Sequence, residues 1–366
     1  MKICQITSAH KPDDIRIYHK QCKSLAKFNH EVTLLCSTDK DFESTSVKFV
    51  KVEKPKNRSE RVTLTLDMMY RKALEIDADI YHAHDPELLY VLKKLKKKGK
   101  KVIFDFHEDI SEQIKSKHYI NKYLRHTISY IYTIFENKII KDLDGIIAAT
   151  PYIQEKYNGE INCIENVNNY PLLEEFKKYD FKTNVREDKV LYIGGLTKSR
   201  GLFTMLKIAK ERPEYNFVFC GDFTNEADKE KAFSQATKNC TFKGFISRKE
   251  ISNELVTSKV GLVLLESLDR YKVALPIKMF EYMASGTPVI ASNFDLWENI
   301  INKSECGFSV SPKDTNAILD VLDKLMENHT LNRKLGKNGR KAVENNYNWK
   351  IEEKKLIKFY KEMENI

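Results

Sequence analysis

Short apolar runs alternate with amphipathic stretches along most of this chain, and no other feature of the sequence restricts the fold as strongly. Runs such as Lys2–Thr7 and Val102–Phe106 have the length and near-continuous apolar character of strands buried on both faces. Stretches such as Arg61–Ile76 and Pro86–Lys98 carry apolar residues at helical spacing. Strands and helices in alternation predict a parallel sheet that is covered by helices on both faces.

The alternation stops once and then begins again, which predicts two domains. The first series runs to Gly145–Ala149, and the second runs from Val190–Ile193 to Pro288–Ala291, so we place the junction near residues 166–185. A chain of 366 residues is long for one hydrophobic core and ordinary for two domains. We therefore expect an α/β protein of two Rossmann-like, doubly wound domains that face each other across a cleft. The ligand is expected at the carboxyl ends of the strands.

Composition limits the partners and the location. The formal net charge of +10 favours a polyanionic partner, which can be nucleic acid, an anionic membrane or a phosphorylated ligand. No run approaches 18 uncharged apolar residues, and the apolar run at the start of the sequence is too short for a signal peptide. We therefore expect a cytoplasmic protein. The seven cysteines are scattered without a CxxC pair, which predicts reduced thiols and no zinc site.

The segment 271–292, YKVALPIKMFEYMASGTPVIAS, carries the most chemical information. Pro276 predicts the start of a helix and Gly286 its end. The free amides and the dipole at a helix start suit a diphosphate, and Glu281 on the second turn can accept two hydrogen bonds from a ribose diol. An ordinary crossover helix with a surface glutamate explains the spacing equally well.

A second segment, LYIGGLTKSRGL at 191–202, places a glycine pair between a strand and a helix. Gly194 and Gly195 let a ligand approach the backbone closely, and Arg200 can neutralise a departing diphosphate. A tight turn with a surface arginine is the alternative. The sequence contains no G-x-G-x-x-G, so it lacks the main support for a nicotinamide cofactor.

In the N-terminal half, polar residues follow two apolar strands. VIFDFHED at 102–109 leads to His107 and Glu108, and YHAHDP at 81–86 leads to His84 and Asp85. We expect His82 and His84 to face opposite ways, so that His84 is the better candidate for the cleft. Metal binding is not expected, because no third ligand has suitable spacing. A structural role for a lone histidine such as His107 remains an alternative.

The loop after the first strand contains KPDDIRI at 11–17. We expect Arg16 to lie at a helix start beside the cleft. A capping cluster of Asp13 and Asp14 with a solvated arginine is an equally good explanation.

The first of these segments resembles the signature of retaining glycosyltransferases of family 4, which have the GT-B fold. Glu281 matches the second of two family glutamates separated by seven residues, which holds the ribose, whereas Val273 stands at the first, which contacts the donor sugar. A branch with the pattern P-x-K-x-F-E-Y-M-A-x-G is more similar. The resemblance implies that the amides of Ile277 and Lys278, which follow Pro276, face the diphosphate.

The other segments resemble the family as well. Gly195 replaces the arginine that usually follows the first glycine, and Arg200 stands where a lysine is usual. His107 corresponds to a histidine that reaches the donor sugar and the acceptor. The resemblance implies three catalytic residues, His107, Arg200 and Glu281. It implies donor-binding residues Gly194, Gly195, Arg200, Pro276, Ile277, Lys278 and Glu281, and acceptor-side candidates Arg16, His84, Asp85 and Glu108.

The resemblance covers nearly the whole chain and implies an activity. It predicts an acceptor-side domain at 1–168, a nucleotide-sugar-binding domain at 183–347, and a terminal helix at 348–366 that packs on the first domain. The implied reaction moves a sugar with retention from a UDP-, GDP- or other nucleoside diphosphate sugar to a glycan or lipid-linked acceptor. The resemblance implies that this reaction is a step of cell-surface polysaccharide biosynthesis. No metal or cofactor is expected, because helix amides and cations stabilise the leaving diphosphate.

A basic and aromatic surface is the last feature. Residues 93–101, KKLKKKGKK, contain seven lysines. A helical pattern at 112–141 follows, with an expected core stripe of Ile120, Leu124, Ile128, Ile131, Phe135 and Ile139. Outside this stripe lie Tyr119, Tyr123 and Tyr130 among Lys115, Lys117, Lys122, Arg125 and His126. The combination favours peripheral binding to the inner, anionic face of the cell membrane, with a solvated lysine-rich surface as the alternative. Nucleic acid is not expected, because no nucleic-acid module is recognised.

Two other functions fit parts of this sequence. A sugar-nucleotide epimerase on the same fold would bind a nucleotide sugar in its C-terminal domain. A non-catalytic basic protein that binds membranes would explain the net charge without any donor site.

Overall fold

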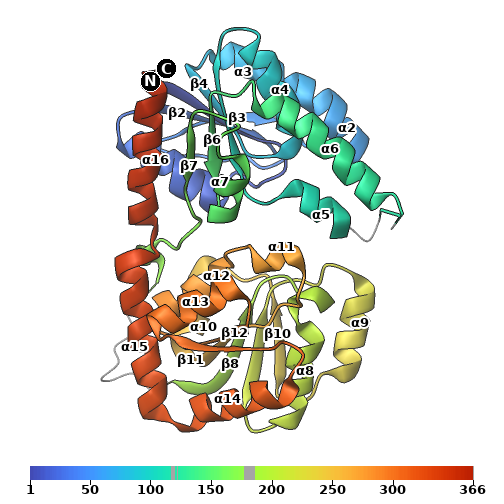
Figure 1. Ribbon diagram of the computed structural model, residues 1–366, viewed down its shortest axis with the longest axis vertical. Helices are drawn as coiled ribbons and strands as arrows, with labels where there is room; N and C mark the ends of the chain where they lie inside the picture. Colours follow the sequence, from blue (N-terminus) through green and yellow to red (C-terminus); the bar gives the residue numbers. More distant parts are fainter. Residues whose placement is uncertain (117–119, 122, 177–185, 366) are drawn as a thin grey trace. The chain divides into compact units, whose positions relative to one another are not determined.

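The computed structural model describes residues 1–116, 120–121, 123–176 and 186–365, and it divides the chain into two α/β units (Figure 1). The N-terminal unit comprises Met1–Asn169 and Lys350–Ile366, and the C-terminal unit comprises Tyr170–Trp349. Of the residues in the expected basic and aromatic surface, Lys117, Tyr119 and Lys122 lie outside the described residues.

The N-terminal unit contains a seven-stranded sheet in which every pair of neighbouring strands is parallel. The strand order is β3-β2-β1-β4-β5-β6-β7, so the direction of the winding reverses between β1 and β4. The strands are β1 (Lys2–Thr7), β2 (Glu31–Ser37), β3 (Lys48–Val52), β4 (Ile80–Ala83), β5 (Lys101–Phe106), β6 (Gly145–Ala148) and β7 (Ile164–Asn166).

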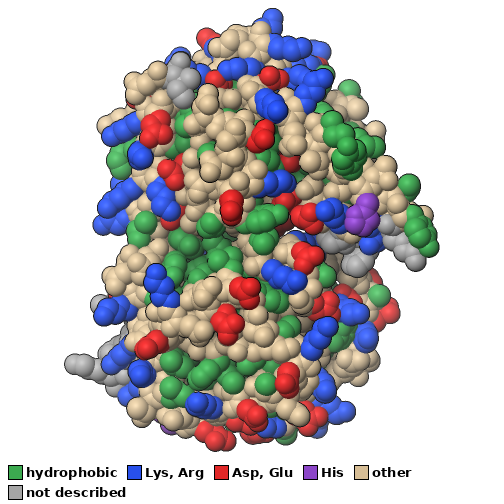
Figure 2. Space-filling model, in the orientation of Figure 1, with side chains coloured by type: hydrophobic (Ala, Val, Ile, Leu, Met, Phe, Trp, Pro, Cys, Tyr) green, Lys and Arg blue, Asp and Glu red, His purple; other side chains and the backbone are tan. Residues whose placement is uncertain are grey.

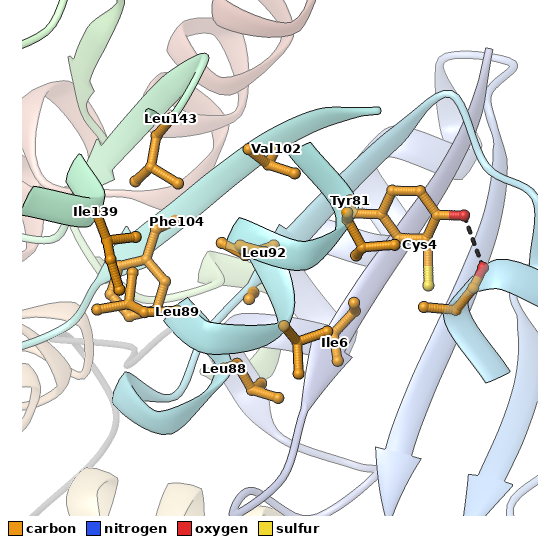
Figure 3. Packing of buried hydrophobic residues seen from close by; sticks show 14 of the residues in the cluster. Cys4, Ile6, Tyr81, Leu88, Leu89, Leu92, Val102, Phe104, Ile139 and Leu143 are labelled. Carbon is orange, nitrogen blue, oxygen red and sulfur yellow. Dashed lines mark hydrogen bonds between the residues drawn. The ribbon is translucent and has the colours of Figure 1, made fainter. Parts of the chain in front are cut away.

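Helical segments cover this sheet and close its core. They are η1 (Ile15–Cys22), α1 (Lys23–Lys27), α2 (Arg58–Glu60), η2 (Arg61–Thr65), α3 (Leu66–Ile76), η3 (Pro86–Leu88), α4 (Leu89–Lys96), α5 (Ile110–Ser116), α6 (Arg125–Ile140), α7 (Pro151–Tyr157) and α16 (Trp349–Glu364). Figure 3 shows Leu92 of α4 among the core residues that include Ile6 of β1 and Val102 of β5. The buried Tyr81 hydroxyl donates a 2.7 Å hydrogen bond to the carbonyl of Ala73, so its polar end is satisfied inside the core.

The C-terminal unit repeats the architecture with a six-stranded parallel sheet in the order β10-β9-β8-β11-β12-β13. Its strands are β8 (Glu187–Ile193), β9 (Asn216–Cys220), β10 (Cys240–Gly244), β11 (Ser258–Val263), β12 (Val289–Ser292) and β13 (Gly307–Val310). Its helical segments are η4 (Leu173–Glu175), η5 (Lys198–Arg200), α8 (Leu202–Glu211), α9 (Glu226–Gln235), α10 (Arg248–Thr257), α11 (Asp269–Lys272), α12 (Ile277–Ala284), α13 (Asp295–Ser304), α14 (Thr315–Glu327) and α15 (His329–Asn346). The expected class of two doubly wound parallel-sheet domains is confirmed.

The last helix, α16, returns to the N-terminal unit. Its Tyr360 hydroxyl lies 3.0 Å from Gln5 Nε2 and 2.8 Å from His82 Nδ1, and all three side chains are buried. Phe359 packs against Gly145 so closely that a Cβ on the glycine would lie 2.6 Å from its ring. α16 is therefore part of the core of the first unit.

The helical pattern at 112–141 was misassigned in one respect. Of the expected core stripe on α6, Ile139 is buried, but Ile128, Ile131 and Phe135 are exposed, as is Leu124 just before the helix. The inner face of α6 instead carries Ser129, which donates to the carbonyl of Ser111, and Glu136, which accepts from the Tyr157 hydroxyl. A helical period identifies a face, but it does not say which face is buried. Among the described residues, no helix has the length and apolar character needed to cross a bilayer.

The lysine run at 93–101 is partly tied to its own unit. Lys96 and Lys100 form ion pairs with Asp144 and Asp77, and Lys101 donates to the carbonyl of Met363. Lys101 also begins β5, so the run lies at the amino-terminal edge of the sheet. The candidate residues His84 and His107 follow strands at the opposite, carboxyl-terminal edge.

Candidate active site

In the N-terminal unit, Asp105 joins two of the four expected acceptor-side residues, Arg16 and His84, to His107. It is the second-last residue of β5 and is fully buried. Its carboxylate accepts hydrogen bonds from Arg16 Nε (2.9 Å) and Nη2 (2.7 Å) and from Gln21 Nε2 (2.6 Å). His84 Nδ1 and His107 Nε2 lie 3.2 Å and 3.1 Å from the same carboxylate oxygen. Burial alone would raise the pKa of Asp105, but Arg16 and His107 outweigh it and hold the pKa well below its usual value.

Arg16 is not the solvated arginine of the alternative explanation. Asp14 does cap η1, because its carboxylate accepts from the amides of Arg16 and Ile17. The Arg16 side chain is only 4% exposed, and its Nη1 also donates to the carbonyl of Val167 at 2.9 Å. Arg16 therefore binds Asp105 through a buried bidentate ion pair.

The prediction that His82 and His84 face opposite ways was wrong. Residues two apart in a strand point to the same face, and the two imidazole rings stack with centroids 4.6 Å apart. His84 Nε2 contacts Gln5 Oε1, while Gln5 Nε2 lies between Tyr360 and His82. Burial lowers the pKa of both histidines, so both favour the neutral form. A chain of polar contacts thus runs from α16 to His84, whose Nδ1 lies 3.2 Å from His107 Nε2.

Asp85 forms a separate anchor at the ends of β1 and β4. It accepts from Thr7 Oγ1 and the Ser8 amide, both at 2.7 Å, and pairs with His10 Nδ1 at 3.0 Å. Burial would raise the pKa of Asp85, but the bonds from His10, Thr7 and Ser8 outweigh it and lower the pKa. With so many partners inside the protein, Asp85 orders the loop after β1.

His107 and Glu108 differ in their surroundings. The His107 side chain is 22% exposed, so one edge is open to solvent while Nε2 is held by Asp105. Glu108 is exposed, and the structure does not join it to the cluster around Asp105. His82, His84 and Asp105 also place three potential ligand atoms within 4.8 Å. The Arg16 guanidinium on Asp105 is a poor neighbour for a cation, so this group fits a hydrogen-bonding network better than a metal site.

In the C-terminal unit, the glycine pair follows β8 at the point where the winding reverses between β8 and β11. Gly194 has φ of 127°, a conformation that favours glycine, and it packs under Gly221, where a Cβ would lie 2.1 Å from the Gly194 carbonyl oxygen. Arg200 ends the turn η5, and its Nη1 lies 3.3 Å from the position of a Cβ on Gly195. The arginine therefore reaches back over the glycine pair.

α12 begins at Ile277 and ends at Ala284, as the sequence predicts. Pro276 precedes it in an extended conformation, and no side chain among the described residues caps the helix start. The first-turn amides of Ile277 and Lys278 are thus available to an anion. Glu281 on the second turn is 5% exposed, and its Oε1 accepts a 2.7 Å bond from Arg248 Nη1.

Arg248 is a residue that the sequence reading missed. It starts α10, and its Nη2 also donates to Glu175 Oε2 at 2.6 Å. Burial would lower the pKa of Arg248, but Glu281 and Glu175 outweigh it and raise the pKa. Val273 stands at the position of the first family glutamate and directly follows α11. On α11, the Tyr271 hydroxyl lies 3.2 Å from Ser199 Oγ of the η5 turn.

Known proteins are similar to this chain in both sequence and fold. The model of glycosyl transferases group 1 matches residues 174–342, and that of glycosyltransferase family 4 matches residues 16–164. Solved structures share the fold over 99% of this chain. They include a sucrose-phosphate synthase from Thermosynechococcus elongatus (17% identity, 98% of that chain, TM-score 0.81) and Anabaena HepE in complex with UDP-glucose (11%, 100%, 0.75).

The two parallel Rossmann-like units and these neighbours show that the chain has the GT-B fold. The two matched segments follow one another along the chain, each covers less than half of it, and both models describe glycosyltransferases.

Curated relatives are more distant. A Bacillus subtilis (strain 168) protein named as a teichuronic acid biosynthesis glycosyltransferase, TuaH, is 24% identical over 43% of this chain and 42% of its own length. The alpha-galactosylglucosyldiacylglycerol synthase of Streptococcus pneumoniae is 21% identical over 62% of this chain and 64% of its own length. The chain therefore matches less than half of the first relative and less than two thirds of the second.

Proposed function

We propose that this protein is a retaining glycosyltransferase that moves a sugar from a nucleoside diphosphate sugar to a glycan or lipid-linked acceptor, as a step of cell-surface polysaccharide biosynthesis. The start of α12 carries the proposal, because uncapped amides, Arg200 and the buried Glu281 lie on neighbouring elements of one unit. The names of the two curated relatives, which concern teichuronic acid and a diacylglycerol glycoside, support this class of acceptor. The UDP and UDP-glucose complexes of HepE support a nucleotide sugar.

In the proposed reaction, the bond from the anomeric carbon to the diphosphate breaks and a bond to the acceptor oxygen forms on the same face. The acceptor proton passes to the leaving phosphate. The α12 amides and Arg200 stabilise the charge that develops on the diphosphate, so the reaction needs no metal. Glu281 binds the ribose diol while it keeps its hydrogen bond from Arg248.

The cluster around Asp105 serves the acceptor side. Asp105 and His84 hold Nε2 of His107, which leaves the exposed edge of the imidazole to bind a sugar hydroxyl. Arg16 is placed to fix Asp105 rather than to contact substrate, because its guanidinium is committed to Asp105 and Val167. The protein thus contributes mainly position and electrostatics.

We also propose that the enzyme binds the membrane from the cytoplasmic side, through α6 rather than the lysine run. α6 carries four large apolar or aromatic side chains that are between 45% and 67% exposed: Tyr130, Ile131, Ile134 and Phe135. Figure 2 shows hydrophobic side chains exposed at the corner of the N-terminal unit where Figure 1 places α6. Such a face suits the acyl boundary of a bilayer that carries a lipid-linked acceptor.

A screen of purified protein against nucleotide sugars tests the function. A donor well above its dissociation constant stabilises the fold by about 3–4 kcal/mol, which thermal unfolding detects. Release of free nucleoside diphosphate only when acceptor is added identifies transfer, whereas a changed sugar without release identifies an epimerase. If no nucleotide sugar raises the unfolding temperature, the enzymatic function is wrong. Activity that is lost in EDTA and restored by manganese would contradict the metal-free reaction.

A further inference from the structure

Lys278 stands on the first turn of α12, but its ammonium group does not extend into solvent. Nζ lies 3.9 Å from the centroid of the Tyr192 ring and 2.8 Å from the position that a Cβ on Gly194 would take. This Nζ is buried and has no hydrogen-bond partner among the described residues. The absence of a side chain on Gly194 leaves the space that Lys278 occupies.

A second cation points to the same place from another element. Arg200 Nη1 lies 3.5 Å from the Cβ position of Gly194, so Arg200 and Lys278 converge on one turn. The nearby carboxylate of Glu281 accepts from Arg248. Burial, followed by the proximity of Arg200, holds the pKa of Lys278 well below its usual value. Without a ligand, this arrangement is therefore unfavourable for a charged lysine.

The turn has the features of a site for a ligand with two adjacent negative charges. A buried amine without a partner costs stability, and two neighbouring cations repel each other. An anion against Gly194 would relieve both effects, and the open amides of α12 lie on the same helix as Lys278. Because Gly194 and Gly195 have no side chains, phosphate oxygens can approach the backbone of the turn as well as both cations.

We propose that the Lys278 side chain, together with Arg200, binds the diphosphate of the donor. This inference rests on the proposed glycosyltransferase function and adds to it the side chain that supplies the second cation. A departing nucleoside diphosphate carries more negative charge than the bound sugar nucleotide. Lys278 therefore binds the leaving group more tightly than the intact donor, and it contributes to turnover as well as to affinity.

The test replaces Lys278 with methionine, which keeps the length of the side chain and removes the amine. UDP, GDP and ADP are the probes, and the one that most stabilises the wild type is used with its matching nucleoside. We expect K278M to bind the diphosphate about 10- to 100-fold more weakly and the nucleoside with unchanged affinity. Ligand-free K278M should unfold at the same temperature as the wild type or a higher one, because no hydrogen bond is lost.

Lys272→Met is the matched control, because Lys272 is an exposed lysine six residues away that pairs with Asp269. It should leave diphosphate binding unchanged. Equal diphosphate affinity in K278M and the wild type would overturn the role of Lys278 and leave the proposed function intact. An equal loss for diphosphate and nucleoside, with a lower unfolding temperature, would also overturn it and assign Lys278 a structural role. If the wild type binds none of the three diphosphates, the proposed function and this inference both fail.

Discussion

Arg248 and Glu281 form an ion pair of 2.7 Å between the start of α10 and the second turn of α12. The same guanidinium holds Glu175 through Nη2. Glu281 is nearly buried, whereas the Glu175 side chain is 22% exposed. One arginine therefore fixes a carboxylate on α12 that has a second oxygen to offer to a ligand, while another carboxylate on η4 balances its charge.

The first prediction concerns the ribose. Glu281→Gln keeps the shape of the side chain but weakens charge-assisted hydrogen bonds to a diol, so donor affinity should fall by about 10-fold or more in titration calorimetry. Glu175→Gln removes the other carboxylate on Arg248 and should change donor affinity by less than about 3-fold. Equal effects of the two substitutions would mean that Glu281 only orients Arg248.

The second prediction concerns the leaving group. Arg200→Ala removes the cation beside the glycine pair, which in the proposed reaction stabilises the departing diphosphate. Turnover should fall by roughly 100-fold in steady-state assays of nucleoside diphosphate release, with a smaller change in KM for the donor. Lys198→Ala in the same turn is the control, since this lysine is exposed. A rise in KM at constant turnover would contradict a role in the transition state.

Several elements could be predicted because local signals agree with the final fold. Strands buried on both faces are continuous apolar runs, and the bounds of α12 follow from Pro276 and Gly286. β7, β10 and β13 were missed, and each is an edge strand whose exposure removes the continuous apolar signal. On α6, the expected core residues Ile128, Ile131 and Phe135 are exposed, because buried hydrogen bonds of Ser129 and Glu136 replace apolar packing there.

The site was only partly visible in the sequence. Asp105 interrupts one apolar strand with a charge, and Gln5 interrupts another with an amide, so the sequence carries a signal of the buried polar cluster. The pairing of Arg248 with Glu281 has no signal in the sequence, because the two residues are 33 positions apart and no local motif connects α10 to α12. The position of Lys278 Nζ over Tyr192 depends in the same way on the packing of α12 against β8.

The third prediction concerns the buried pair of Asp105 and Arg16. Asp105→Asn leaves the guanidinium without its counter-charge, so the unit should lose about 3 kcal/mol or more of stability at pH 7, seen as a lower thermal midpoint. Because the pKa of Asp105 is lowered, its contribution is complete above about pH 4 and is lost as the pH falls through the folded pKa. The difference between variant and wild type should therefore shrink from pH 7 towards pH 2.

Asp77→Asn is the control for this prediction, because Asp77 is an exposed carboxylate that pairs with Lys100. Its effect on the thermal midpoint should be much smaller than that of Asp105→Asn. A difference for Asp105→Asn that does not change with pH would show that shape rather than charge accounts for the loss.

The fourth prediction concerns protons. Burial and, to a smaller extent, Arg200 lower the pKa of Lys278, while Glu281 raises it. Burial also raises the pKa of Tyr192, so this phenol does not exchange protons in the same pH range. An arriving diphosphate favours the charged amine, so binding should take up protons, and affinity should fall as the pH rises through the lowered pKa of Lys278. Calorimetry of UDP or GDP in two buffers of different ionisation enthalpy measures the uptake. Uptake of the same size in K278M would assign the protons to another group.

The last prediction concerns the membrane. The exposed face of α6 carries Tyr130, Ile131 and Ile134, and each side chain that enters the acyl boundary contributes roughly 1 kcal/mol. Replacing all three with serine should weaken binding to phosphatidylglycerol vesicles by about 10-fold or more in a pelleting assay, while activity on a short water-soluble acceptor survives. Replacing Lys97 and Lys98 with glutamine should have a smaller effect, because these lysines follow α4 and are not part of the exposed face of α6. If the lysine variant loses vesicle binding and the α6 variant keeps it, the attachment is electrostatic and α6 is not the membrane surface. If the wild type does not bind the vesicles at low salt, where surface electrostatics are strongest, the membrane proposal is wrong altogether.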